Sequence, residues 1–195
     1  MNIDFYFDFI SPYSYLAATQ ASDFEEKNGV KFNWIPVNLP RLMKLSGNTS
    51  PATVKNKAIY SLRDLNRWVT YLNVPFKMVR PGTFDSRPAL RVAAALQGKD
   101  RSNFCQQVFE CLWSGEVDLT SEDWLDQVFQ IRQLPADYSK LGSESFEDFT
   151  HAALKAGAFG VPTFILENGG QPRVFFGIDH MDFLRRACQQ ANTKG

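Results

Sequence analysis

The hydrophobic pattern at the start of the chain predicts a strand, a helix and a second strand. Between residues 3 and 9, apolar residues alternate with two aspartates and a tyrosine, which is the two-residue period of a β-strand. Ser11-Pro12 predicts a helix start, with serine as N-cap and proline at the first helical position. We expect this helix to end at Asn28-Gly29 and a second strand to span residues 30–37.

The middle of the chain predicts helices and no strand. Thr120-Ser121-Glu122-Asp123 matches a capping box ahead of one apolar run, and four other runs also have helical spacing. We expect about five helices between residues 40 and 157. Their signals lie at residues 59–72, 90–96, 104–112, 125–131 and 146–156.

The pattern of strands returns at the end of the chain. Short β-prone runs at residues 163–166 and 173–176 flank Asn168-Gly169-Gly170, a hairpin signature, and residues 181–190 predict a last helix. The order is β-α-β, a helical block, then β-β-α, which is that of an α/β thioredoxin-like fold with a large all-helical insertion. We expect residues 1–39 and 158–195 to form the thioredoxin-like domain and residues 40–157 the insertion.

Composition narrows the class of protein. Of the 195 residues, 44% are hydrophobic, enough for a packed core, and 21 basic residues balance 21 acidic ones. This balance gives no reason to expect nucleic acid or an anionic membrane as a partner. No signal peptide or membrane-spanning run is predicted. The three cysteines, Cys105, Cys111 and Cys188, lie outside any C-x-x-C unit, so we expect reduced thiols in a cytoplasmic protein, with Cys105 and Cys111 in the core.

Several common types of active site are excluded by their motifs. The two histidines, His151 and His180, lie far apart, and no G-x-S-x-G, P-loop, G-x-G-x-x-G or metal-spaced Cys/His set is present. We therefore expect neither a Ser-His hydrolase nor a zinc site. We interpret His151 as a solvated residue.

Ser11 stands where a thioredoxin-like redox protein carries the first cysteine of C-x-x-C, and Ser14 stands at the second. It can serve simply as a helix N-cap, or its hydroxyl and the helix N-terminus can hold an anion. Val161-Pro162, just before the third strand, bears on this choice because a cis-proline faces the active turn in thioredoxin folds. The alternative is an ordinary trans proline at a strand entry.

Five segments together give the chain its family resemblance. It resembles the thioredoxin-fold family of 2-hydroxychromene-2-carboxylate isomerases and kappa-class glutathione transferases, a branch of the DsbA-like group. The isomerase branch is favoured by the opening segment and by D-L-N-R-W at residues 64–68. The matching segments are residues 4–17, 47–68, 111–125, 157–165 and 175–184.

The resemblance implies a glutathione site. Ser11 matches the serine that donates a hydrogen bond to the glutathione sulfur, and Asp179 matches the acid that binds the γ-glutamyl ammonium. Val161 matches the residue before cis-Pro162 whose backbone pairs with the cysteinyl part. Asn48 and Lys57 match residues lining the site. The chain departs from the family pattern at Lys55, Ile178 and His180, where the family commonly has a proline, a small polar residue and an arginine. At Ile178 only the backbone N–H can still bind glutathione.

The implied activity is a glutathione-dependent isomerisation of 2-hydroxychromene-2-carboxylate to trans-o-hydroxybenzylidenepyruvate, by reversible addition of the glutathione thiolate. Lys57 is the first candidate cation for the substrate carboxylate. The expected substrate-binding residues are Tyr13, Lys57, Phe84 and Asp85, with Lys55, Arg41, Arg87 and Trp113 as further candidates; each aromatic can equally be core.

Two other functions are compatible with the sequence. One is a kappa-like transferase or peroxidase acting on another electrophile, and the other is a non-catalytic thioredoxin-fold binding module. The resemblance also implies a homodimer. Loss of both C-x-x-C cysteines excludes disulfide chemistry of the DsbA kind at this turn.

Overall fold

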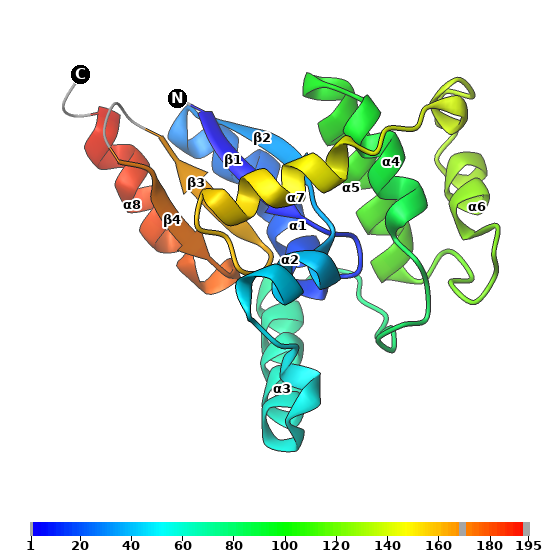
Figure 1. The fold of residues 1–195 in the computed structure, drawn as a ribbon, viewed down its shortest axis with the longest axis horizontal. Helices are drawn as coiled ribbons and strands as arrows, with labels where there is room; N and C mark the ends of the chain where they lie inside the picture. The colour runs from blue at the N-terminus through cyan, green and yellow to red at the C-terminus, as the bar shows by residue number, and fades with distance from the viewer. Residues whose placement is uncertain (1, 168–170, 193–195) are drawn as a thin grey trace.

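A computed structural model describes residues 2–167 and 171–192. Figure 1 shows a small sheet surrounded by helices. The elements follow one another as β1 (Asn2–Phe7), α1 (Pro12–Asn28), β2 (Lys31–Pro36), α2 (Leu39–Ser46), η1 (Pro51–Thr53), α3 (Lys55–Leu72), α4 (Arg87–Ala95), α5 (Gly98–Ser114), α6 (Trp124–Ile131), η2 (Tyr138–Lys140), α7 (Ser145–Lys155), β3 (Thr163–Leu166), β4 (Arg173–Phe176), η3 (Ile178–His180) and α8 (Met181–Asn192).

The sheet has the strand order β2-β1-β3-β4, with β1 parallel to β2 and antiparallel to β3. Tyr6 pairs with Thr163, and Thr163 pairs with Phe176. Because β1, β2 and β4 end where β3 begins, the loops after β1, β2 and β4 meet the loop before β3 at one edge of the sheet. This shared edge positions the candidate site.

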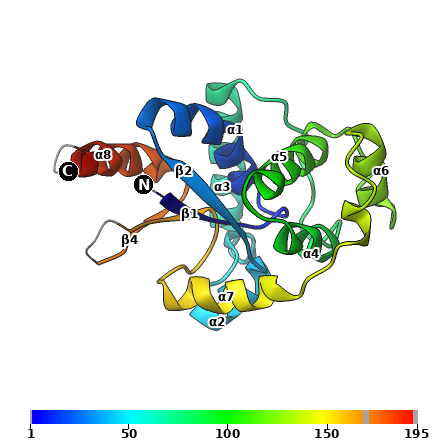
Figure 2. The same cartoon turned by 90° about the horizontal axis from the view of Figure 1, so that it is seen from above.

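Helices cover both faces of the sheet. In Figure 2, α1 and α8 lie on one side of the sheet and α7 with α2 on the other, while α4, α5 and α6 gather beyond β2. α3 extends away from the body of the protein in Figure 1. None of the helices in residues 2–167 and 171–192 is long and apolar enough to cross a membrane.

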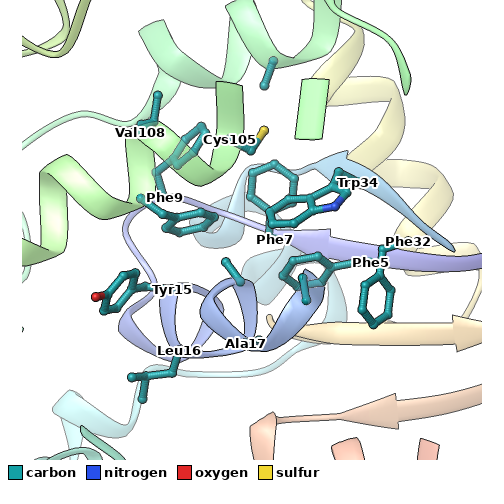
Figure 3. Close-up of a cluster of buried hydrophobic side chains, with 14 of the residues drawn as sticks. Phe5, Phe7, Phe9, Tyr15, Leu16, Ala17, Phe32, Trp34, Cys105 and Val108 are labelled. Carbon is teal, nitrogen blue, oxygen red and sulfur yellow. The ribbon is translucent and has the colours of Figure 1, made fainter. Parts of the chain in front are cut away.

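The larger core cluster lies between β1, α1 and α5. Figure 3 shows Phe5, Phe7 and Phe9 beside Trp34, with Cys105 and Val108 of α5 on the far side. The alternate residue Tyr6 faces the smaller cluster under α2 and α7, as the period of a strand requires. All three cysteines are buried and form no disulfide, so Cys105 and Cys111 pack in the core as predicted.

Most predicted element boundaries agree with the structure. Ser11 caps α1, Pro12 is its first residue, and Gly29 ends it in the left-handed conformation with φ 63°. Both terminal strands are found at the predicted residues, whereas the Asn168-Gly169-Gly170 turn lies outside the described residues. The division into two domains at residues 39 and 158 stays a prediction.

Two predictions about the helical block require correction. The described residues between 40 and 157 contain six α-helices rather than about five, because α2 was not predicted: it has eight residues, and Leu42 is its single buried side chain. The predicted capping box is wrong. Thr120 bonds to the Asp118 carboxylate in a turn, and α6 begins after Asp123 instead.

We predict that Phe5→Ala lowers the free energy of unfolding by about 3–5 kcal/mol, because it leaves a cavity in the aromatic cluster. The Phe5 ring is fully buried and lies 5.0 Å from the Phe164 ring and 4.8 Å from the Trp34 ring, centroid to centroid. Chemical denaturation measures the change, and Phe183→Ala, which truncates an exposed ring, is the matched control. Equal losses in both variants would contradict this account of the core.

Candidate functional site

The N-terminus of α1 presents a hydroxyl at the shared sheet edge. The Ser11 side chain is only 4% exposed, and its Oγ accepts the Ser14 N–H at 3.1 Å. A hydroxyl that accepts one bond still has its proton to donate. The first turn of α1 carries no acidic residue to oppose the positive end of the helix dipole. Ser11 is therefore an N-cap whose hydroxyl proton is still available to donate. The interpretation of Ser11 as a helix cap is thus compatible with its interpretation as a group that can hold an anion.

The cis-proline loop lies at the same edge. The Val161-Pro162 peptide bond is cis, as predicted, and the Gly177 N–H donates to the Pro162 carbonyl at 2.9 Å. Within the described residues, the Val161 N–H and C=O make no hydrogen bond. A backbone amide and carbonyl without partners can pair with an extended peptide.

The segment after β4 brings a carboxylate towards α1. The Asp179 side chain is mostly exposed, and its Oδ1 lies 3.4 Å from His180 Nδ1. η3 packs against α1, and Ile178 beside Asp179 is buried. Burial is the main cause that raises the pKa of the Tyr13 hydroxyl. The neighbouring carboxylate of Asp64 raises it further, and that of Asp179 adds a smaller contribution.

Asn48 connects the α2–α3 loop to the cis-proline loop. It follows Gly47, which ends α2, and its Nδ2 donates to the Phe159 carbonyl at 2.9 Å. The Val161-Pro162 bond comes two residues after Phe159. The structure thus places Asn48 beside the loop that contains Val161.

Lys57 lies on the face of α3 that meets α1. The Tyr13 hydroxyl donates to the Asp64 carboxylate at 3.1 Å and to the Ser61 carbonyl at 3.2 Å. Lys57, Ser61 and Asp64 are spaced four and three residues apart, so they share one helix face. Within the described residues the exposed Lys57 makes no ion pair, whereas Arg41 pairs with Glu147 and Arg87 with Asp85.

The other candidate substrate residues have partners within the protein. The half-buried Phe84 ring lies 5.4 Å from the Trp124 ring of α6, centroid to centroid. The Asp85 carboxylate pairs with the Arg87 guanidinium, Oδ2 to Nη2 at 2.7 Å. The hydrogen bonds from this guanidinium lower the pKa of the Asp85 carboxyl. Trp113 is buried, and its indole N–H donates to the Phe9 carbonyl at 3.1 Å, so it supports from the core the turn that leads to Ser11.

Sequence reasoning missed a buried carboxylate under the site. The strand pattern marks Asp8 only as a polar position, yet its side chain is fully buried. Burial raises the pKa of the Asp8 carboxyl to about 6, although hydrogen bonds from Leu39, Ser86 and Ile10 oppose that shift. Its sequence signal was a charged residue between two phenylalanines at the end of a strand.

The serine at the second position of the turn also has an unusual environment. Ser14 is fully buried, and within the described residues its Oγ has no hydrogen-bond partner. In the same part of the chain, no group of three or more His, Cys, Asp or Glu side chains is arranged to hold a metal ion.

Together, the fold and this edge are those of a thioredoxin-like protein whose redox turn carries two serines. Residues 2–189 match the model of the DSBA-like thioredoxin domain, so the chain belongs to that family. It is 28% identical over 191 residues to a 2-hydroxychromene-2-carboxylate isomerase of Sphingobium xenophagum, covering 93% of this chain and 95% of that protein.

A second relative has a different activity. The chain is 26% identical over 199 residues to glutathione S-transferase kappa 1 of Rattus norvegicus, covering 93% of this chain and 88% of that one. A solved structure of a 2-hydroxychromene-2-carboxylate isomerase superposes over 100% of both chains with a TM-score of 0.80 and 26% identity. These findings confirm the predicted fold and resemblance, and the relatives so named are enzymes.

We predict that Asp8 makes the protein less stable as the pH rises. A carboxyl with a raised folded-state pKa contributes stability that is fully present below about pH 4 and lost as the pH rises through about 6. Relative to Asp8→Asn, the wild type should lose about 3 kcal/mol of unfolding free energy across this window. Urea denaturation at several pH values measures the loss, with Asp4→Asn as the matched control for removing one carboxylate. A constant difference between wild type and Asp8→Asn would contradict it.

Proposed function

We propose that this protein is a glutathione-dependent isomerase that interconverts 2-hydroxychromene-2-carboxylate and trans-o-hydroxybenzylidenepyruvate. The observation that carries the proposal is the Ser11 hydroxyl, which caps α1 and keeps a proton to donate at the edge where the cis-Pro162 loop and Asp179 also lie. The isomerase relatives, which match nearly the full length of the chain, support the choice of reaction.

The residues at this edge fit glutathione. The unpaired backbone of Val161 suits the cysteinyl peptide, and Asp179 suits the γ-glutamyl ammonium. The Asn48 amide borders the cis-proline loop, and the Ile178 backbone N–H stands beside Asp179. Pro162 fixes the loop through its bond from Gly177.

The chemistry that glutathione supplies when bound is a thiolate, which adds reversibly to the conjugated side chain of the substrate and lets a double bond rotate. Ser11 holds the sulfur anion by its O–H, assisted by the α1 N-terminus, and so lowers the pKa of the thiol. Lys57, with no acidic partner in the described structure, is available for the substrate carboxylate. Tyr13, Phe84 and Asp85 border the substrate side in this proposal.

A second candidate function is a kappa-like transferase or peroxidase on another electrophile, and the kappa-class relatives favour it. The two functions share the glutathione site and differ only in the acceptor. Turnover of the chromene with unchanged glutathione identifies an isomerase. Consumption of glutathione with chlorodinitrobenzene, without chromene turnover, identifies a transferase.

We predict that Ser11→Ala lowers kcat about 10²–10³-fold, the usual effect of removing one donor to a developing or bound anion. Glutathione affinity should fall less than tenfold, and the pKa of the bound thiol, followed by ultraviolet absorbance of the thiolate, should rise. Because the variant also loses an N-cap, its unfolding free energy should fall by about 1 kcal/mol.

Ser14→Ala is the matched control for Ser11→Ala, since the Ser14 hydroxyl makes no hydrogen bond within the described residues. It should retain both kcat and the thiol pKa. An unchanged thiol pKa in Ser11→Ala, or the absence of glutathione binding at millimolar concentration in the wild type, would sink the proposed function.

We further propose that the protein is a homodimer, and the exposed apolar side chains of α3 support this. Tyr60, Leu62 and Tyr71 are exposed on this helix, whereas Leu65 is buried. We predict a mass of about twice 22.2 kDa by light scattering, and a shift to one chain in Leu62→Glu. The charge-reversing control is Lys55→Glu on the same helix. A single-chain mass for the wild type would overturn this prediction.

A further inference from the structure

The proposed function leaves one prominent group unexplained, the buried carboxylate of Asp8. A buried carboxylate without a cationic partner is costly, and apolar residues fill such positions in ordinary cores. Asp8 lies at the end of β1, three residues before Ser11, on the sheet face covered by α2 and α7. Here it is fully buried, while the other acid of the strand, Asp4, is only half-buried and bonds Asn33.

The Asp8 carboxylate accepts three hydrogen bonds. Its Oδ1 accepts the Ile10 N–H at 3.2 Å and the Ser86 hydroxyl at 2.7 Å, and its Oδ2 accepts the Leu39 N–H at 2.8 Å. The Asp8 backbone carbonyl also accepts the Ser11 N–H at 3.1 Å.

Each donor belongs to a different segment of the candidate site. Ile10 precedes Ser11 in the turn, and Leu39 is the first residue of α2, whose end leads to Asn48. Ser86 follows Phe84 and Asp85 and precedes α4. The Asp8 side chain thus joins three segments of the candidate site. One leads to Ser11, one leads through α2 to Asn48, and one carries the candidate substrate residues Phe84 and Asp85.

We propose that Asp8 is a positioning residue for the glutathione site, whose ionised carboxylate holds the Ser11 turn, the start of α2 and the start of α4 in one arrangement. This inference rests on the proposed function. The physical reason is the number of acceptors: an ionised carboxylate serves all three donors, whereas the amide of asparagine presents one oxygen and turns an N–H group towards a donor. Asparagine therefore leaves at least one of the three segments unattached.

Other charged groups surround Asp8 and enter any pH dependence. Asp85 and Arg87 lie at the start of α4, Arg41 lies on α2, and Glu147 and His151 lie on α7. Asp85 raises the pKa of Asp8, whereas the Ser86 hydroxyl lowers it. The two histidines, His151 on α7 and His180 beside Asp179, are each replaced by glutamine as controls in the test.

The test is calorimetric binding of γ-glutamyl-alanyl-glycine, glutathione with alanine in place of cysteine, so that no thiol titrates. It is measured from about pH 5 to about pH 8 on the wild type, Asp8→Asn, Ser86→Ala, His151→Gln and His180→Gln. The wild type should bind about tenfold more weakly on the acid side, as one segment loses its acceptor, with the midpoint near pH 6.

Asp8→Asn should bind weakly at every pH and lose this midpoint, whereas both histidine variants should keep it. Ser86→Ala should move the pH midpoint of binding to higher pH, because it removes a hydrogen bond that lowers the pKa of Asp8. This shift tests the role of Asp8 even if Asp8→Asn does not fold. Two results would overturn this inference alone while the wild type still binds the peptide. One is a pH midpoint of binding that Ser86→Ala does not move, and the other is a midpoint that disappears in a histidine variant. No peptide binding by the wild type overturns the proposed function along with it.

Discussion

β1 is paired with β2 in parallel and with β3 in the opposite direction, and the candidate site takes its shape from that register. The pairing of Tyr6 with Thr163 sets the turn after β1 against the loop before β3. The Val37 N–H bond to the Phe7 carbonyl, at 2.9 Å, then brings the start of α2 to the same edge. A slip of one residue would turn Phe5 and Phe7 out of the core, so the burial of these rings fixes the register and with it the site.

The parts of this fold that depend on local chemistry could be predicted from the sequence. Ser11, Pro12 and Gly29 mark the ends of α1 by capping rules that operate within a few residues. The strand period predicted β1, and the β-prone runs beside a hairpin signature predicted β3 and β4. The cis bond at Pro162 needed the wider order of elements as well, because the tetrapeptide around it is compatible with either isomer.

The parts that depend on distant contacts could not be predicted. α2 has helical spacing in Leu39, Leu42 and Met43, but it has only eight residues, and its packing against α7 is a contact that no local pattern predicts. The start of α6 was missed for a local reason instead, because Thr120 is engaged by Asp118 and the helix begins after Asp123. The hydrogen bond of Asp8 to Ser86 joins residues 78 positions apart, so the place of Asp8 between two phenylalanines could not show which groups it would hold. The distances from Asn48 to Phe159 and from Tyr13 to Asp64 likewise follow from tertiary packing.

The bond from the Asn48 amide to the Phe159 carbonyl has a consequence for the spacing of two loops. At 2.9 Å it joins the α2–α3 loop to the cis-proline loop, so these two segments cannot separate without breaking it. An amide nitrogen carries two hydrogens, and the Phe159 carbonyl uses one of them. The same side chain can therefore tie the two loops together and still offer one N–H at this edge of the sheet.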